Sequence, residues 1–116
     1  MGSGANSFIS RAPRFDLKVP VVLYLRDRLA SGYSINVSES GMLATFNRTV
    51  DPLLKGHLCA VAGEWHLSID VHIVRVEGRV TAMAFEIEGE ADRATIQKLI
   101  DHAEHEHAIE LPAPAA

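Results

Sequence analysis

The chain has 116 residues, of which 47% are hydrophobic, so it is long enough and apolar enough to fold as one domain around its own core. Its net charge of −4 argues against a general nucleic-acid coat or a protein held on anionic membranes by charge. A single cysteine, Cys59, excludes an internal disulfide, and no apolar run approaches a membrane span, so we expect a cytoplasmic domain that binds neither DNA nor RNA and does not insert into membranes.

Apolar and polar residues alternate through most of the chain with the period of two that is typical of β-strands. The clearest alternation covers residues 15–26 and the segment that starts at Trp65, which predicts two long strands with one buried face each. Pro20 cannot donate to a strand ladder, so it predicts a bulge or an edge position. Shorter strands are predicted at residues 33–38, 42–46, 57–62 and 79–87.

Turns and irregularities separate these strands. Residues 27–32 are predicted to form a connecting turn, and residues 47–55 a loop. Gly63-Glu64 and Glu77-Gly78 are predicted hairpin turns, with Gly78 supplying a positive φ. In the strand that starts at Trp65 the alternation slips, and a bulge near Ile73-Val74 would restore it.

A helix is predicted over residues 90–105, because apolar residues recur there with a period of 3.6. Its apolar stripe is predicted to cover one face of the last strand. The helix stripe consists of Ile96, Leu99, Ile100 and Ala103. The strand face consists of Thr81, Met83, Phe85 and Ile87. The fold class is therefore mainly all-β: a six-stranded antiparallel β-barrel with a C-terminal α-helix. We expect a flexible segment at residues 1–8, a single domain at residues 9–105 and a flexible tail at residues 106–116.

A cluster of small polar residues lies between the second and third predicted strands. Asn36 and Ser38 are two apart, so they should share one strand face beside Gly41, whose backbone can take a positive φ and lets a ligand approach closely. On the evidence of the turn alone, a hairpin turn with a locally bonded Asn and Ser is the preferred interpretation.

No catalytic or metal-binding set stands out. One strand face carries possible triad members, but strand alternation alone explains a solvated polar face, so we expect no enzyme. These residues are His66, Ser68, Asp70 and His72. Histidines near the predicted helix end, namely His102, His105 and His107, are expected to bind no metal, because zinc sites need three or four convergent ligands.

Two motifs together resemble the signature of the PilZ domain family. One is the pair of arginines before the first predicted strand, and the other is Asn-x-Ser-x-x-Gly between the second and third predicted strands. Asn36, Ser38 and Gly41 match its second half in full. Arg14 matches the second arginine of the family's Arg-x-x-x-Arg, while Arg11 comes one residue late and gives Arg-x-x-Arg. The resemblance covers about residues 8–104. It implies a six-stranded barrel with a helix, and cyclic di-GMP as the ligand of these five residues.

Three functions compete at this stage. The first is a cyclic di-GMP receptor in bacterial second-messenger signalling, which passes its signal to a downstream protein partner. The second is a degenerate PilZ-like domain that binds no nucleotide and acts as a protein–protein interaction module. An enzyme has least support. The spacing of Arg11 and Arg14 separates the first two, and we favour the receptor, which needs no cofactor beyond its ligand.

Overall fold

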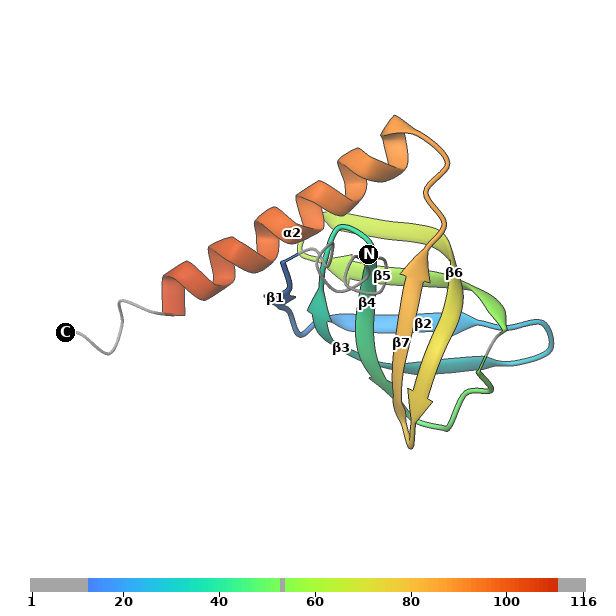
Figure 1. Cartoon of the computed structure of the whole chain (residues 1–116). Helices are drawn as coiled ribbons and strands as arrows, with labels where there is room; N and C mark the ends of the chain where they lie inside the picture. The colour runs from blue at the N-terminus through green and yellow to red at the C-terminus, as the bar shows by residue number, and fades with distance from the viewer. Residues whose placement is uncertain (1–12, 53, 111–116) are drawn as a thin grey trace, which may run out of the picture.

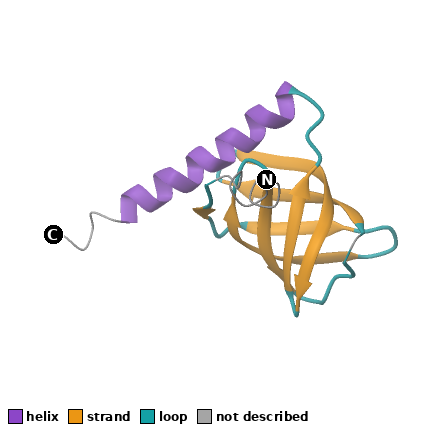
Figure 2. Cartoon of the chain, viewed as in Figure 1, coloured by secondary structure: helices purple, strands orange, loops and turns teal. Residues whose placement is uncertain are grey.

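The alternating segments form seven β-strands and are followed by one helix in a computed structural model, which describes residues 13–52 and 54–110 (Figures 1 and 2). The strands are β1 (Phe15–Asp16), β2 (Pro20–Tyr24), β3 (Leu29–Val37), β4 (Gly41–Phe46), β5 (Lys55–Ala62), β6 (Trp65–Glu77) and β7 (Val80–Phe85), and the helix is α2 (Glu90–Glu110). The predicted flexible segment at residues 1–8 and the end of the predicted tail, residues 111–116, lie outside the described residues.

The sheet closes on itself. Its order is β1-β3-β2-β5-β6-β7-β4, and a further antiparallel pairing of β3 with β4 joins its two sides. Six strands, β2 to β7, therefore form a closed antiparallel barrel, and β1 adds a short pairing at the end of β3. Closure removes the exposed sheet edges that an open sheet would leave. The predicted fold class is confirmed.

The predicted first strand is divided in two. Its apolar face is buried as predicted, but residues 17–19 leave the ladder between β1 and β2. Ser34 of β3 lies at this break: its Oγ accepts a hydrogen bond from Val19 N at 2.9 Å and donates one to Leu17 O. Two backbone bonds to β3 remain beside it, from Leu17 N to Ile35 O and from Ser34 N to Val19 O. A buried hydroxyl thus replaces ladder bonds at this point. Pro20 is the first residue of β2, a position where its missing N–H costs little.

β3 begins earlier than predicted. The expected turn at residues 27–32 is wrong, because Leu29 to Gly32 pair with β2 as a hairpin and the chain bends at Arg26 and Asp27. The predicted turn at Gly63-Glu64 is confirmed, with a φ of 63° at Gly63. The other predicted hairpin turn lies one residue later, at Gly78-Arg79, with the expected positive φ of 65° at Gly78.

Two β-bulges interrupt the ladders. The register of β6 against β7 shifts between Ile73 and Arg75, which confirms the predicted bulge and leaves Val74 57% exposed. The register of β3 against β4 shifts between Ser34 and Asn36. The sequence did not predict this second bulge, which makes Ile35 the extra residue.

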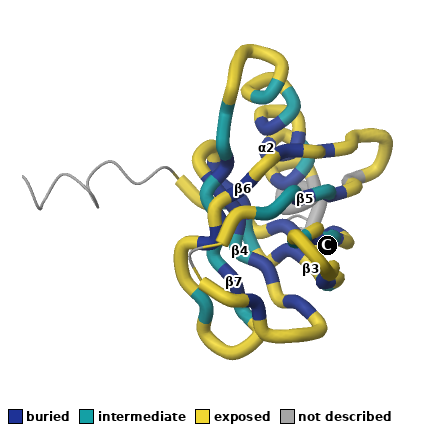
Figure 3. The backbone as a smooth tube through the Cα atoms, turned by 90° about the vertical axis from the view of Figure 1, so that its right-hand side faces the viewer, coloured by how far each residue is buried: buried dark blue, intermediate teal, exposed yellow. Residues whose placement is uncertain are grey.

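The core fills the barrel interior and one of its ends, and buried residues alternate with exposed ones along the strands (Figure 3). The predicted stripe of α2 is buried. However, α2 contacts chiefly β6 and β1, and Thr81 and Met83 of β7 are buried inside the barrel, so the predicted cover by the helix is wrong for this part of the β7 face. The helix continues five residues beyond the predicted end at residue 105. Within the described residues, no helix combines the length and apolar character needed to cross a membrane.

Candidate functional site

The turn between β3 and β4 is built around Ser38, which is 2% exposed. Its Oγ accepts hydrogen bonds from Ser40 N and Gly41 N, both at 3.2 Å, and lies 3.2 Å from Ser40 Oγ. This is the locally bonded turn that the sequence allowed. Asn36 and Ser38 therefore do not form one exposed polar platform: Ser38 holds the turn, and Asn36 alone reaches the surface.

Gly41 is required by close packing of backbones. Among the described glycines, a positive φ occurs at Gly63 and Gly78, so the positive φ expected at Gly41 is wrong. A Cβ at Gly41 would lie only 2.2 Å from Met83 O of β7, a distance that no side chain tolerates. The close approach is made by the neighbouring strand, and Phe85 N donates to Ser40 O beside it.

Arg14 and Asn36 join the two halves of the sequence signature. Arg14 directly precedes β1, whose Asp16 pairs with Asn36 of β3. This register brings the arginine to the end of β3, where Arg14 Nη1 donates a hydrogen bond to Asn36 Oδ1 at 2.9 Å. The bulge at Ile35 helps to aim Asn36, as bulges do next to binding sites. The fifth predicted site residue, Arg11, lies outside the described residues.

The pair retains unused hydrogen-bonding capacity. Arg14 is exposed and Asn36 is half-buried. Among the described residues, only Asn36 accepts a hydrogen bond from the Arg14 guanidinium, and none accepts one from the Asn36 amide NH2. A guanidinium has five N–H donors. The pair can therefore offer several donors to an anionic or oxygen-rich ligand without first breaking its own bond.

A second polar cluster forms across β5 and β6. His57 lies between Asp70 and Ser68, with Nδ1 2.7 Å from Asp70 Oδ1 and Nε2 2.6 Å from Ser68 Oγ. The sequence grouped Ser68 and Asp70 with histidines of their own strand and missed His57, because it lies on the neighbouring strand. All three side chains are on the outer face, and strands pair along both edges of β5. His57 pairs with Asp70 in the register of β5 and β6, so the cluster is a cross-strand pairing of polar side chains.

No group of three or more His, Cys, Asp or Glu side chains converges on a metal position in residues 13–52 and 54–110 as far as their side chains are described. His102 and His105 line a shallow pocket with Trp65, over whose ring Lys98 Nζ lies at 4.4 Å. The His107 side chain is outside the described part. That these histidines bind no metal stays a prediction.

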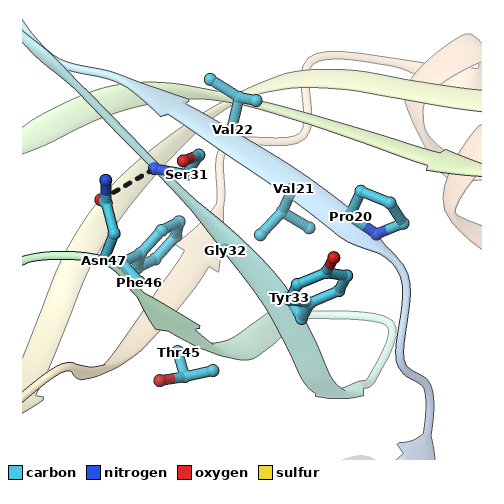
Figure 4. A pocket seen from close by; sticks show the side chains of 9 residues that line it. All are labelled: Pro20, Val21, Val22, Ser31, Gly32, Tyr33, Thr45, Phe46 and Asn47. Carbon is cyan, nitrogen blue, oxygen red and sulfur yellow. Dashed lines mark hydrogen bonds between the residues drawn. The ribbon is translucent and has the colours of Figure 1, made fainter.

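Another surface depression lies over β2, β3 and β4 (Figure 4). Its lining includes Tyr33, Phe46 and Asn47, and Asn47 Oδ1 accepts a hydrogen bond from Ser31 N at 3.2 Å. None of the residues that line it is charged. The nearby Lys18 Nζ lies 5.6 Å from the centroid of the Tyr33 ring. The depression contains none of the predicted site residues, so the Arg14–Asn36 pair is the better candidate site.

Fold and site together define a small β-barrel domain whose candidate site is a surface arginine–asparagine pair. The family model described as PilZ domain matches residues 9–102, and the chain belongs to the PilZ domain family. No curated protein sequence matches the chain.

Two solved structures share the fold. The PilZ domain with c-di-GMP of YcgR from Escherichia coli is 12% identical in sequence, with a TM-score of 0.78. The match covers 89% of this chain and 97% of the YcgR chain. The PilZ domain of CeSA from a cellulose-synthesizing bacterium is 14% identical in sequence, with a TM-score of 0.71. The match covers 81% of this chain and 100% of the CeSA chain.

Proposed function

We propose that this domain is a receptor for cyclic di-GMP in bacterial second-messenger signalling and that it binds the ligand at the Arg14–Asn36 pair. The observation that carries the proposal is the hydrogen bond between the two halves of the signature, Arg14 Nη1 to Asn36 Oδ1 at 2.9 Å. Membership of the PilZ domain family and the similarity to a PilZ domain with c-di-GMP support it.

The chemistry of the ligand fits these groups. Cyclic di-GMP carries phosphates and guanines. Arginine binds phosphate or the O6/N7 edge of guanine with a planar fork, and stacks on base rings. In this site Asn36 holds one edge of the Arg14 guanidinium, which reduces the freedom that the side chain loses on binding. The free amide NH2 of Asn36 supplies a further donor to a guanine oxygen or a phosphate.

The other predicted residues take different roles in this proposal. Ser38 and Gly41 support the site: Ser38 fixes the β3–β4 turn, and Gly41 lets β4 and β7 approach. Arg11 is proposed as a second ligand contact. Its spacing to Arg14 is one residue short of the family pattern, so Ser10→Arg, which restores Arg-x-x-x-Arg, should raise the affinity.

Isothermal titration calorimetry with cyclic di-GMP tests the proposal. Arg14→Ala should weaken binding by about 2 kcal/mol or more, roughly thirtyfold, because the contact is charge-assisted and loses water on binding. Arg26→Ala is the matched control: it removes the same charge from an exposed arginine beside the β2–β3 turn and should leave the affinity within about twofold.

A wild-type protein that gives no heat at millimolar ligand would contradict the receptor function and leave the protein–protein interaction module. Equal binding by wild type and Arg14→Ala would contradict only the proposed site.

A further inference from the structure

The bulge in β6 turns an arginine outward. Along the sequence, Arg75 falls on the apolar side of the alternation. The register shift between Ile73 and Arg75 corrects this, because Arg75 pairs with Ala82 while Ile73 remains inside, 1% exposed. Arg75 is exposed, and no residue in the described part of the chain forms an ion pair or hydrogen bond with it. Arg75 therefore lies on the outer wall of the barrel with its guanidinium available to a ligand.

Arg75 and Asn36 are the ends of one row across the sheet. Asn36 of β3 pairs with Leu43 of β4, Leu43 with Ala82 of β7, and Ala82 with Arg75 of β6. These four strands lie side by side in the barrel wall (Figure 1). With neighbouring strands about 4.8 Å apart, the two end residues are at most about 14 Å apart along the wall.

The two residues in the middle of this row, Leu43 and Ala82, are apolar and half-buried. The residues on either side of Leu43 along β4, Met42 and Ala44, are buried in the barrel interior. Because strand residues alternate between faces, Leu43 faces outward, and it is half-buried, as is Ala82 on β7. A flat group can therefore lie on Leu43 and Ala82 between the Arg14–Asn36 pair and Arg75.

We infer that Arg75 is a further ligand-binding residue of the same site, contacting the far guanine of cyclic di-GMP. This rests on the function proposed above. The ligand has two guanines, one on each ribose of its sugar–phosphate ring, so donors at two separated positions can each bind one of them. Arg14 and Asn36 supply one. Arg75 supplies the other, with a fork that matches the O6 and N7 acceptors of guanine, while Leu43 and Ala82 contact the ligand from below.

Titration of cyclic di-GMP into Arg75→Ala, Arg75→Gln and the Arg26→Ala control tests this inference. Arg75→Gln keeps much of the side-chain stem, so it separates loss of the charged fork from loss of packing. Both Arg75 variants should bind about tenfold more weakly than wild type or worse, because each loses a charge-assisted bidentate contact. Arg26→Ala should stay within about twofold of wild type.

The outcomes are distinguishable. A wild type that binds, with Arg75→Ala and Arg75→Gln no weaker than Arg26→Ala, overturns the role of Arg75 and leaves the receptor function intact. A wild type that does not bind overturns both. Melting temperatures within about 2 °C of wild type, expected for an exposed residue, show that the variants are folded.

Discussion

Replacing Ser34 by alanine is a sharp test of how the N-terminal part of the barrel is held. Ser34 is 3% exposed, and its single hydroxyl bonds two backbone groups, Val19 N–H and Leu17 C=O. No other hydrogen bond to either group occurs among the described residues. Ser34→Ala therefore leaves a buried donor and a buried acceptor without partners.

Each such group costs about 1–3 kcal/mol when it is left unsatisfied. Some of this is recovered, because the serine hydroxyl itself no longer has to be desolvated and residues 17–19 can shift slightly. We expect a net loss of about 2–3 kcal/mol in the free energy of unfolding. For a domain of this size, that corresponds to a melting temperature about 8–12 °C lower.

Urea unfolding followed by far-UV circular dichroism measures the change. Ser31→Ala is the matched control, since it removes an exposed serine hydroxyl from the same strand and should change stability by no more than about 0.5 kcal/mol. The two variants should share the m-value of the wild type. If Ser34→Ala costs no more than Ser31→Ala, the hydroxyl does not replace the missing ladder bonds, and the account of the divided first strand is wrong.

Three further predictions concern the core and the helix. Thr81→Val should stabilise the protein by about 1 kcal/mol in urea unfolding, because Thr81 Oγ1 is buried and has no hydrogen-bond partner among the described residues; a loss of stability would refute this. Leu99→Ala should cost about 2–5 kcal/mol because Leu99 is 1% exposed, whereas a loss well under about 1 kcal/mol would mean that α2 does not pack on the barrel as described. Addition of EDTA should leave the melting temperature unchanged, and a clear decrease would reveal a structural metal, with His102, His105 and His107 as the first candidates.

Local pattern was sufficient to predict the barrel. Alternation over residues 15–26 and from Leu67 onward gave the buried faces correctly, and the break in alternation located the bulge near Ile73. Trp65, predicted on the same buried face, is 41% exposed at the start of β6. The buried faces and the bulge follow from the polarity of the individual side chains, which the sequence gives directly. The β3–β4 turn was also predictable, because Ser38 bonds groups within three residues of itself.

What the sequence missed depends on partners far along the chain. The role of Ser34 could not be predicted from its own strand, because its hydroxyl bonds the backbone of Leu17 and Val19, which lie far from it along the chain. The bulge at Ile35, the contact of Met83 O with Gly41 and the position of Arg75 opposite Ala82 all follow from strand register. Register is a property of paired strands, and one strand's sequence does not specify it.

Mapping amide chemical shifts during a titration with cyclic di-GMP tests the central claim most directly, because it reports both binding and its place. We predict saturable shifts concentrated at Arg14, Asn36, Leu43 and Arg75, with the amide of Arg26 unmoved. Absence of any shift at millimolar ligand, or shifts confined to the neighbourhood of Arg26, would contradict a cyclic di-GMP site at the Arg14–Asn36 pair.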